Sequence, residues 1–305
     1  MIGVLAGFWR PKGALNLINS LSIDVEEWFH PELVREKVAP EERKGRIDVA
    51  IQPLLHLLNR YKVKASFFFL GEVASENPRL VLQLHKEGHE IASHGMSHHP
   101  LGVLGPERFR QEMKEFIDLM QKIVGNIRIH GFRAPTFSLN RETQWALPIL
   151  KDLGFSYDAS LFPAKIWGNQ LYGVEGAPRV PYRISLINLL KEDPHSPLME
   201  FPNTVLSFGG MSIPLGGGFY LRALPLWALI MGLKRVNQFA PFNLYIHPWE
   251  IDPQTPRLPL ALKSRWITYY GIDSTLKKLE ALLRHFSFSR VDEVLASTLR
   301  TPSSG

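Results

Sequence analysis

Residues 91–99 read Ile-Ala-Ser-His-Gly-Met-Ser-His-His and place His94 and His98 four positions apart. The apolar pair Ile91-Ala92 is typical of a buried strand end, whereas Ser93-His94-Gly95 is typical of a loop. Two imidazoles at this spacing fall on one face of a helical turn, close enough to share one ion. Because α/β folds build their sites where strands end, this stretch predicts a metal site and a hydrolase.

An acid-rich segment well upstream offers a carboxylate to complete the site. Residues 22–30 read Ser-Ile-Asp-Val-Glu-Glu-Trp-Phe-His and contain Asp24, Glu26 and Glu27. Two histidines and one carboxylate leave coordination positions open for water and substrate. Strand alternation puts Asp24 and Glu26 on the same face about 7 Å apart, so one can hold the metal while the other faces its water. The chain has no cysteine, so only N and O ligands are available.

Composition sets the broad class of protein. The 305 residues are 45% hydrophobic and 21% charged, which suffices for one large folded domain. Lys and Arg number 35 against 29 Asp and Glu, a net charge of +6. The basic residues are scattered without a dense block, so we expect no nucleic-acid partner. An anionic partner, either a polyanionic glycan or a membrane surface, is the alternative interpretation of the charge.

Two apolar segments bear on the membrane. Met1 to Trp9 is apolar, but the charges Arg10 and Lys12 come after it, the reverse of a secretory signal. We therefore expect a cytoplasmic protein or one peripheral to the membrane. Residues 224–231 are the most apolar run but are too short to span a bilayer. They predict a buried or substrate-proximal helix, with weak peripheral membrane contact as the alternative.

Strand-like and helix-like segments alternate along the chain, which predicts βα units around a parallel sheet or barrel. Expected strands cover about 15–25, 65–70, 88–93, 127–132 and 242–246, and expected helices cover 47–61, 77–87, 106–125, 141–153 and 274–285. Prolines and glycines interrupt the pattern at about 163–222, which predicts an irregular insertion. We expect a single domain over 1–305, with a catalytic core of about 20–255.

Further motifs stand at strand ends or in loops: Gly131-Phe132-Arg133-Ala134-Pro135-Thr136, Tyr157-Asp158-Ala159-Ser160, Gly216-Gly217-Gly218-Phe219 and His247-Pro248-Trp249-Glu250. Their order after the acidic strand end and His-x3-His resembles that of the polysaccharide deacetylases, carbohydrate esterase family 4. The resemblance covers roughly residues 20–253. Within that family the chain is similar to the exopolysaccharide-associated branch found with exosortase systems, in which Asp-Val-Glu replaces an Asp-Asp pair.

The resemblance implies a distorted (β/α)7 barrel with the site at the carboxyl ends of the strands. It also implies that Glu26, His94 and His98 hold a divalent metal, with Glu27 as the competitor of Glu26 for the third position. Zn²⁺ is the leading metal, and Co²⁺, Ni²⁺ and Mn²⁺ are alternatives.

Catalytic roles follow from the same resemblance. Asp24 is the expected base, Arg133 the cation that orients it, His247 the acid that protonates the leaving amine, and Asp158 the residue that orients His247. The residues alone leave other interpretations open. Arg133 also fits a structural salt bridge, His247 a capped loop histidine, and Asp158 a turn or cap residue. His89 is expected to be a structural histidine with its hydrogen bonds satisfied, and not a ligand.

Two residues are expected to contact the substrate. A backbone N–H near Thr136 is expected to stabilise the oxyanion, and Trp249, beside the late histidine, is the best candidate for stacking on a sugar ring. The implied activity is metal-dependent removal of N-acetyl groups from a GlcNAc-containing polysaccharide, either an exopolysaccharide or a cell-wall glycan. The alternatives are an amidase of the same fold acting on a small non-glycan amide, and an inactive glycan-binding protein.

Overall fold

A computed structural model describes residues 17–164, 173–208 and 211–300. The apolar N-terminal segment with Arg10 and Lys12 lies outside the described residues, as does part of the predicted insertion. None of the described helices is both long and apolar enough to cross a membrane.

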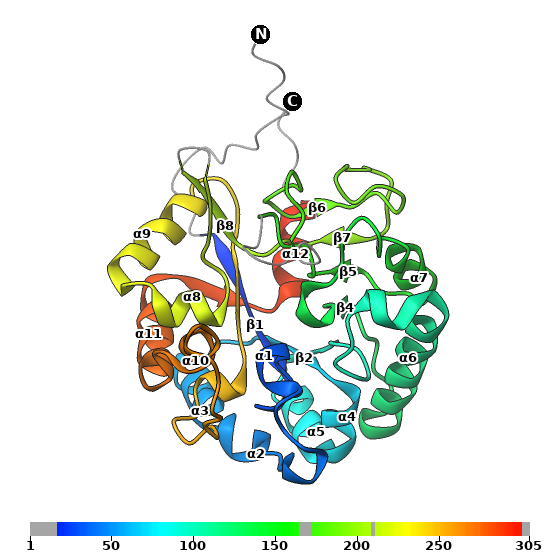
Figure 1. Ribbon diagram of the computed structural model, residues 1–305. Coiled ribbons are helices and arrows are strands. Elements are labelled where there is room, and N and C mark those ends of the chain that lie inside the picture. The colour runs from blue at the N-terminus through cyan, green and yellow to red at the C-terminus, as the bar shows by residue number, and fades with distance from the viewer. Residues whose placement is uncertain (1–16, 165–172, 209–210, 301–305) are drawn as a thin grey trace.

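One curled sheet organises the described part of the chain (Figure 1). Its order is β10-β1-β2-β3-β4-β5-β7-β6, and β11 also pairs with β1. Every neighbouring pair from β10 to β7 is parallel, whereas β6 is antiparallel to β7. The strands are β1 (Ile18–Val25), β2 (Ser66–Phe69), β3 (Glu90–Ser93), β4 (Gly131–Phe132), β5 (Tyr157–Asp158), β6 (Tyr182–Arg183), β7 (Met199–Glu200), β10 (Asn243–Ile246) and β11 (Ser287–Ser289). A separate hairpin joins β8 (Val205–Phe208) to β9 (Met211–Pro214).

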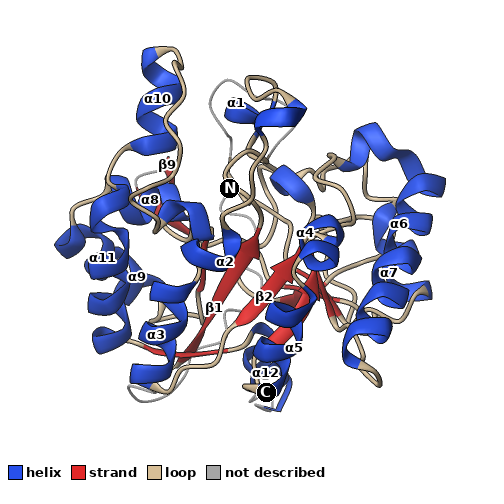
Figure 2. Cartoon of the chain, turned by 90° about the horizontal axis from the view of Figure 1, so that it is seen from below, coloured by secondary structure: helices blue, strands red, loops and turns tan. Residues whose placement is uncertain are grey.

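Helices surround this sheet (Figures 1 and 2). They are α1 (Glu32–Arg35), α2 (Ile47–Ala50), α3 (Gln52–Tyr61), α4 (Gly71–Glu76), α5 (Pro78–Lys86), α6 (Leu101–Val124), α7 (Ala146–Asp152), α8 (Gly218–Ala223), α9 (Leu226–Val236), α10 (Leu262–Tyr269), α11 (Ile272–His285) and α12 (Val291–Arg300). Short 3-10 turns are η1 (Pro40–Glu42), η2 (Pro135–Phe137) and η3 (Pro248–Glu250). This arrangement confirms the predicted α/β class.

Burial explains why the central strands form. All four residues of β2 are buried, as expected of a nearly continuous apolar run covered on both faces of a parallel sheet. α3 buries Leu54, Leu55 and Leu58 against the same core and exposes its polar face. The register aligns Asp24 with Phe68, and Phe68 with Ala92, so β1, β2 and β3 end at one edge.

Several sequence expectations need correction. The strand expected at 127–132 is reduced to β4, and α6 starts five residues earlier than expected, with a kink at Gly105 ahead of Pro106. Residues 163–222 contribute β6 and β7 to the main sheet as well as the hairpin. The helix predicted near 224–231, either buried or close to the substrate, is α9, which buries Leu229 but leaves Trp227 and Met231 exposed.

Candidate active site

The three predicted metal ligands meet at the carboxyl edge of the sheet. Glu26 directly follows β1, and His94 directly follows β3. His98 lies four residues further on, in a loop instead of the expected helical turn. One ligand atom from each residue lies within 4.8 Å of the others, and all three side chains are buried. Nε2 of His98 is 2.7 Å from Oε2 of Glu26.

The protonation states of this cluster suit a cation. Nδ1 of His94 lies 2.8 Å from the carbonyl oxygen of Arg133, which assigns the proton to Nδ1 and leaves the Nε2 lone pair free. Burial lowers the pKa of His94 to about 4, so this imidazole is neutral. Burial opposes ionisation of Glu26, but His98 and His247 lower the pKa of its carboxyl well below the usual range.

One atom of the cluster has no partner. Nδ1 of His98 is buried and makes no hydrogen bond to any described residue. Nε2 of the same ring is the nitrogen that faces Glu26, so the fit to a metal depends on that atom instead. Two imidazoles, of which His94 is neutral, and the ionised carboxylate of Glu26 are a donor set that fits a divalent metal ion.

Glu27, the competitor of Glu26, is engaged elsewhere. Its Oε2 accepts a 2.8 Å hydrogen bond from the backbone N–H of Arg46, and its Oε1 accepts one of 3.0 Å from that of Ile47. These amides are at the first turn of α2. A carboxylate there accepts hydrogen bonds from the free N–H groups and interacts favourably with the helix dipole. The structure therefore selects Glu26 as the carboxylate of the cluster.

Asp24 forms a buried ion pair with Arg133. Nη1 of Arg133 is 2.5 Å from Oδ1 of Asp24 and 3.0 Å from the hydroxyl of Ser22. The guanidinium is fully buried, donates from Nε to the carbonyl of Ala159, and lies 4.2 Å from the centre of the Phe68 ring. These contacts fix Oδ1 of Asp24 and leave Oδ2 facing the site.

His247 lies close to both Asp24 and Glu26. Its Nε2 lies 3.9 Å from Oδ2 of Asp24 and 3.6 Å from Oε1 of Glu26. Its Nδ1 is 2.8 Å from Oε2 of Glu250. Burial disfavours the imidazolium, but the carboxylates of Glu26, Glu250 and Asp24 outweigh it and raise the pKa of His247 to about 9. At neutral pH the ring is therefore protonated, and Nε2 carries a proton toward the site.

Glu250 was not predicted as a site residue. Its Oε1 lies 3.0 Å from both Nε and Nη2 of the buried Arg222. The backbone at Gly218 also passes so close that an added Cβ would lie 1.7 Å from Oε2 of Glu250. This close approach explains one glycine of the triple-glycine motif. The sequence signal for Glu250 was its place three residues after His247, where its carboxylate also accepts from the His247 N–H.

The predicted role of Asp158 needs correction. Its carboxylate accepts hydrogen bonds from the hydroxyl of Ser160 at 2.6 Å and from the N–H of Ser160 at 3.0 Å. The Ser160 hydroxyl oxygen in turn accepts from the N–H of Ala134 at 2.7 Å. Asp158 thus shapes the loop that carries Arg133, whereas the carboxylate beside Nδ1 of His247 belongs to Glu250. The Tyr-Asp-x-Ser pattern is explained by this contact with the arginine loop.

Trp249 also differs from its predicted role. The side chain is only 7% exposed and stacks on His247, with ring centres 5.3 Å apart and planes 20° apart. Its Nε1 donates a 3.0 Å hydrogen bond to Oε1 of Glu26. A ring buried in this way has no free face for a sugar, so the structure places Trp249 beneath the site as a support.

Thr136 has an unusual backbone conformation. Its φ and ψ are 56° and 17°, and Phe137 follows with a φ of 54°. A β-branched residue in the left-handed region is rare, and such strain concentrates at functional sites. The Thr136 hydroxyl donates to the carbonyl of Pro135 at 2.7 Å. The predicted oxyanion contact through its backbone stays a prediction.

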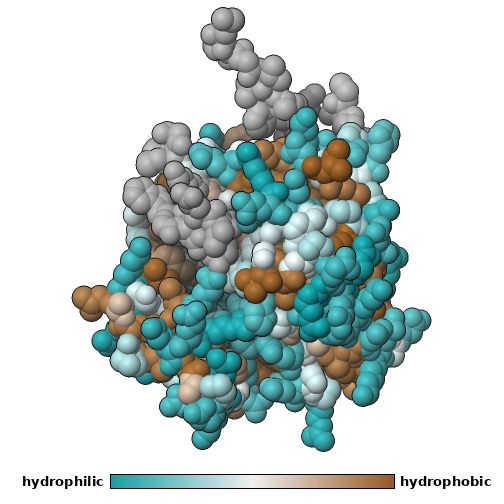
Figure 3. All heavy atoms as spheres, turned by 45° about the vertical axis from the view of Figure 1, so that its right-hand side comes forward, coloured by the Kyte–Doolittle hydropathy of each residue, from teal (hydrophilic) through white to brown (hydrophobic). Residues whose placement is uncertain are grey.

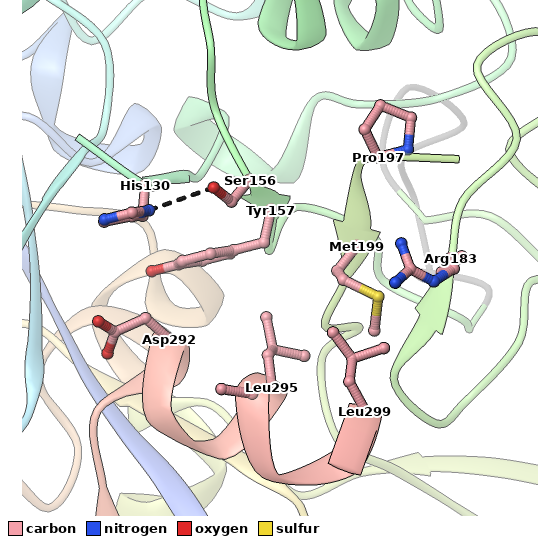
Figure 4. A pocket seen from close by; sticks show the side chains of 10 residues that line it. His130, Ser156, Tyr157, Arg183, Pro197, Met199, Asp292, Leu295 and Leu299 are labelled. Atoms are coloured by element: carbon pink, nitrogen blue, oxygen red, sulfur yellow. Dashed lines mark hydrogen bonds between the residues drawn. The ribbon is translucent and has the colours of Figure 1, made fainter. Parts of the chain in front are cut away.

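A cavity of about 380 Å³ lies at the amino ends of β4, β5 and β7, away from the carboxyl ends that carry the site (Figure 4). Its walls include His130, which precedes β4, the first residues of β5 and β7, and Asp292 and Leu295 of α12. None of the predicted catalytic or metal-binding residues lines it. The chemistry of the site is therefore separate from this cavity.

Two family models match adjacent parts of the chain. Residues 48–157 match the family model described as polysaccharide deacetylase, and residues 159–296 match one described as a domain of unknown function, DUF3473. Residues 48–157 thus match the family that the sequence motifs resemble, over about a third of the chain. The boundary between the two matches falls at β5, so both contribute strands to one sheet. Asp24 and Glu26 precede the first match, and His247 lies in the second.

Curated relatives match over short segments. The chain is 32% identical over 72 residues to a peptidoglycan-N-acetylglucosamine deacetylase of Bacillus cereus, covering 24% of this chain and 26% of the relative. It is 37% identical over 83 residues to a chitooligosaccharide deacetylase of Rhizobium leguminosarum bv. trifolii, covering 26% and 39%. The matches thus span well under half the length of these relatives.

Solved structures share the fold over nearly the whole chain. A polysaccharide deacetylase of Mycobacterium smegmatis superposes with a TM-score of 0.58 at 17% identity, covering 97% of this chain and 96% of that one. The PuuE allantoinase gives 0.58 at 13% identity, covering 95% and 92%. A polysaccharide deacetylase of Pseudomonas aeruginosa PAO1 gives 0.56 at 16%, covering 94% and 92%. The distorted (β/α) barrel predicted from the sequence is confirmed.

Proposed function

We propose that this protein is a metal-dependent N-deacetylase acting on a GlcNAc-containing polysaccharide, either an exopolysaccharide or a cell-wall glycan. The observation that carries the proposal is the buried cluster of Glu26, His94 and His98, with Asp24 and His247 both facing it. The names of the relatives, which are deacetylases of chitooligosaccharides and peptidoglycan, support this substrate class.

Glu26, His94 and His98 would hold the metal. Two imidazoles and one carboxylate suit Zn²⁺ first, with Co²⁺, Ni²⁺ and Mn²⁺ as alternatives. A bound divalent ion supplies Lewis acidity, which lowers the pKa of water and polarises a carbonyl group.

The remaining residues handle protons and position. Oδ2 of Asp24, the oxygen that Arg133 does not hold, accepts the proton of the attacking water. Nε2 of His247 donates a proton to the leaving amine, while Glu250 keeps the ring oriented through Nδ1. A backbone N–H in the strained turn at Thr136 stabilises the oxyanion.

Acetate release from N-acetylglucosamine oligomers tests this proposal. We expect the wild-type protein to release acetate, and Asp24→Asn to retain the metal but lose the activity by a factor of roughly 10²–10⁴ or more. Glu26→Gln should lose the metal. If Asp24→Asn loses the metal and Glu26→Gln retains it, the two roles are exchanged.

The same assay separates the competing functions. A small-amide amidase would hydrolyse a monomeric acetamide and release no acetate from the oligomers. An inactive glycan-binding protein would bind the oligomers without releasing acetate. Action at the cytoplasmic side or at the membrane periphery is the proposed location, and it can be checked by fractionating cells that express the full chain.

A further inference from the structure

The short helix α10 turns hydrophobic side chains toward solvent. Leu262 is 85% exposed, Trp266 is 49% exposed, and Tyr270, just beyond the helix, is 48% exposed. Residues spaced by four lie on one face of a helix, so these three side chains form a single stripe. Such a stripe normally packs against a core. Here α10 stands out from the rest of the fold, on the side toward which β1 and β2 point (Figure 2).

Basic residues accompany this stripe. The α10 finger, residues 253–271, contains Arg257, Lys263 and Arg265 and has no acidic residue. All three basic side chains are exposed, and Lys263 and Arg265 flank the stripe within the helix. In the view of Figure 3, hydrophobic residues form small groups among hydrophilic ones. The finger therefore combines an exposed apolar stripe with uncompensated positive charge.

The α10 finger is firmly attached to the site. Arg222, which holds Glu250, also donates hydrogen bonds to the carbonyls of Ile267, at 2.9 Å, and Tyr270. The Trp266 ring contacts that of Phe219, with centres 5.2 Å apart. An element ordered in advance loses little conformational entropy when it binds a partner.

We infer that the α10 finger docks the protein onto an anionic membrane surface. Trp and Tyr favour the bilayer interface, Leu262 can enter its apolar part, and Lys263 and Arg265 can bind anionic headgroups. A glycan site would normally add carboxylates or amides to its aromatic rings, but the finger has no Asp, Glu or Asn, and its one amide, Gln254, already accepts a hydrogen bond from Arg46. Docking in this way would fix the active site beside the membrane. The inference does not depend on the proposed deacetylase activity.

Vesicle co-sedimentation of the full chain tests the inference. Vesicles of phosphatidylcholine alone are compared with vesicles that also contain phosphatidylglycerol. We expect binding to the anionic vesicles that weakens with salt. Leu262→Ser with Trp266→Ser should reduce binding by about tenfold or more. Lys263→Gln with Arg265→Gln should reduce it by about fivefold per charge and weaken its salt dependence.

Matched controls separate this effect from misfolding and from the enzymatic proposal. Val103→Ser changes a side chain on α6 that is 70% exposed and should leave vesicle binding unchanged. All these variants should release acetate from soluble oligomers at the wild-type rate, if the proposed activity exists. Wild-type protein that ignores anionic vesicles would overturn the inference. It would also be overturned if the Leu262/Trp266 variant bound normally, or if that variant changed only self-association measured by sedimentation velocity.

Discussion

Nε1 of Trp249 donates a 3.0 Å hydrogen bond to Oε1 of Glu26, whose other oxygen lies 2.7 Å from Nε2 of His98. Both oxygens of the proposed carboxylate ligand are therefore fixed by side chains from distant parts of the sequence. Trp249 also stacks on His247, so one buried ring supports both a proposed metal ligand and the proposed acid. Residues that orient a ligand in this way commonly tune metal affinity.

Trp249→Phe should therefore weaken metal binding. Phenylalanine keeps an aromatic ring against His247 but cannot donate to Glu26. We expect the dissociation constant of the metal to rise about 10- to 100-fold, measured by competition with a chelator. Trp28→Phe is the matched control, because Trp28 lies in the same buried cluster and its Nε1 donates to the carbonyl of Lys44. Equal metal affinity in both variants would contradict the supporting role of Trp249.

Glu250→Gln should shift the pH dependence of activity. The acid must be protonated, so activity falls as pH rises through the pKa of His247, which is raised to about 9. Removing one of the carboxylates that raise this pKa moves the alkaline limb to lower pH. We also expect turnover to fall by less than the roughly 10²–10⁴-fold expected when a general acid is removed completely.

Asp158→Asn serves as the control for that profile. Asp158 contacts Ser160 and not His247, so the alkaline limb should stay where it is in the wild type. Steady-state rates across pH on the same oligomer measure both variants. A shift in Asp158→Asn with none in Glu250→Gln would restore the role predicted from the sequence.

Glu90 should make stability depend on pH. Burial and the charge of Asp292 raise its pKa to about 8 from an ordinary value of 4.5. Between these values the folded protein holds a proton that the unfolded chain releases, so this group's contribution to stability falls as pH rises. His89, whose pKa burial lowers to about 4, contributes in the opposite direction only below about pH 6.5.

Glu90→Gln should remove this component. Urea unfolding at several values between pH 6.5 and 8 should give a flatter dependence of the unfolding free energy on pH than in the wild type. The pKa of His247 is raised in both proteins, so its contribution to the pH dependence cancels when the two curves are compared. Parallel pH curves would show that Glu90 does not hold its proton in the folded state.

Much of the fold was predictable because the pattern was local. The apolar run of β2 and the apolar stripe of α3 each predict burial from the pattern of a few neighbouring residues. Short strands were harder, since β4, β5 and β7 have two residues each and are defined by their neighbours in the sheet. Propensity cannot indicate such strands, because pairing with other segments creates them.

Some site residues were likewise predictable from the sequence, and others were not. His94, His98 and Glu26 stand in a recognisable order, and the structure brings them together. The choice between Glu26 and Glu27 depended on the backbone amides at Arg46 and Ile47, which the sequence cannot place. The partner of His247 and the burial of Trp249 likewise depend on contacts between distant segments.

Metal titration coupled to acetate release tests the central claim most directly. Protein stripped by a chelator is given increasing Zn²⁺, while acetate from an N-acetylglucosamine oligomer and bound metal are measured together. We predict that stripped protein is inactive and that activity rises in proportion to occupancy, reaching its maximum at about one ion per chain. Full activity in the stripped protein, or full occupancy by Zn²⁺ without acetate release, would contradict the account.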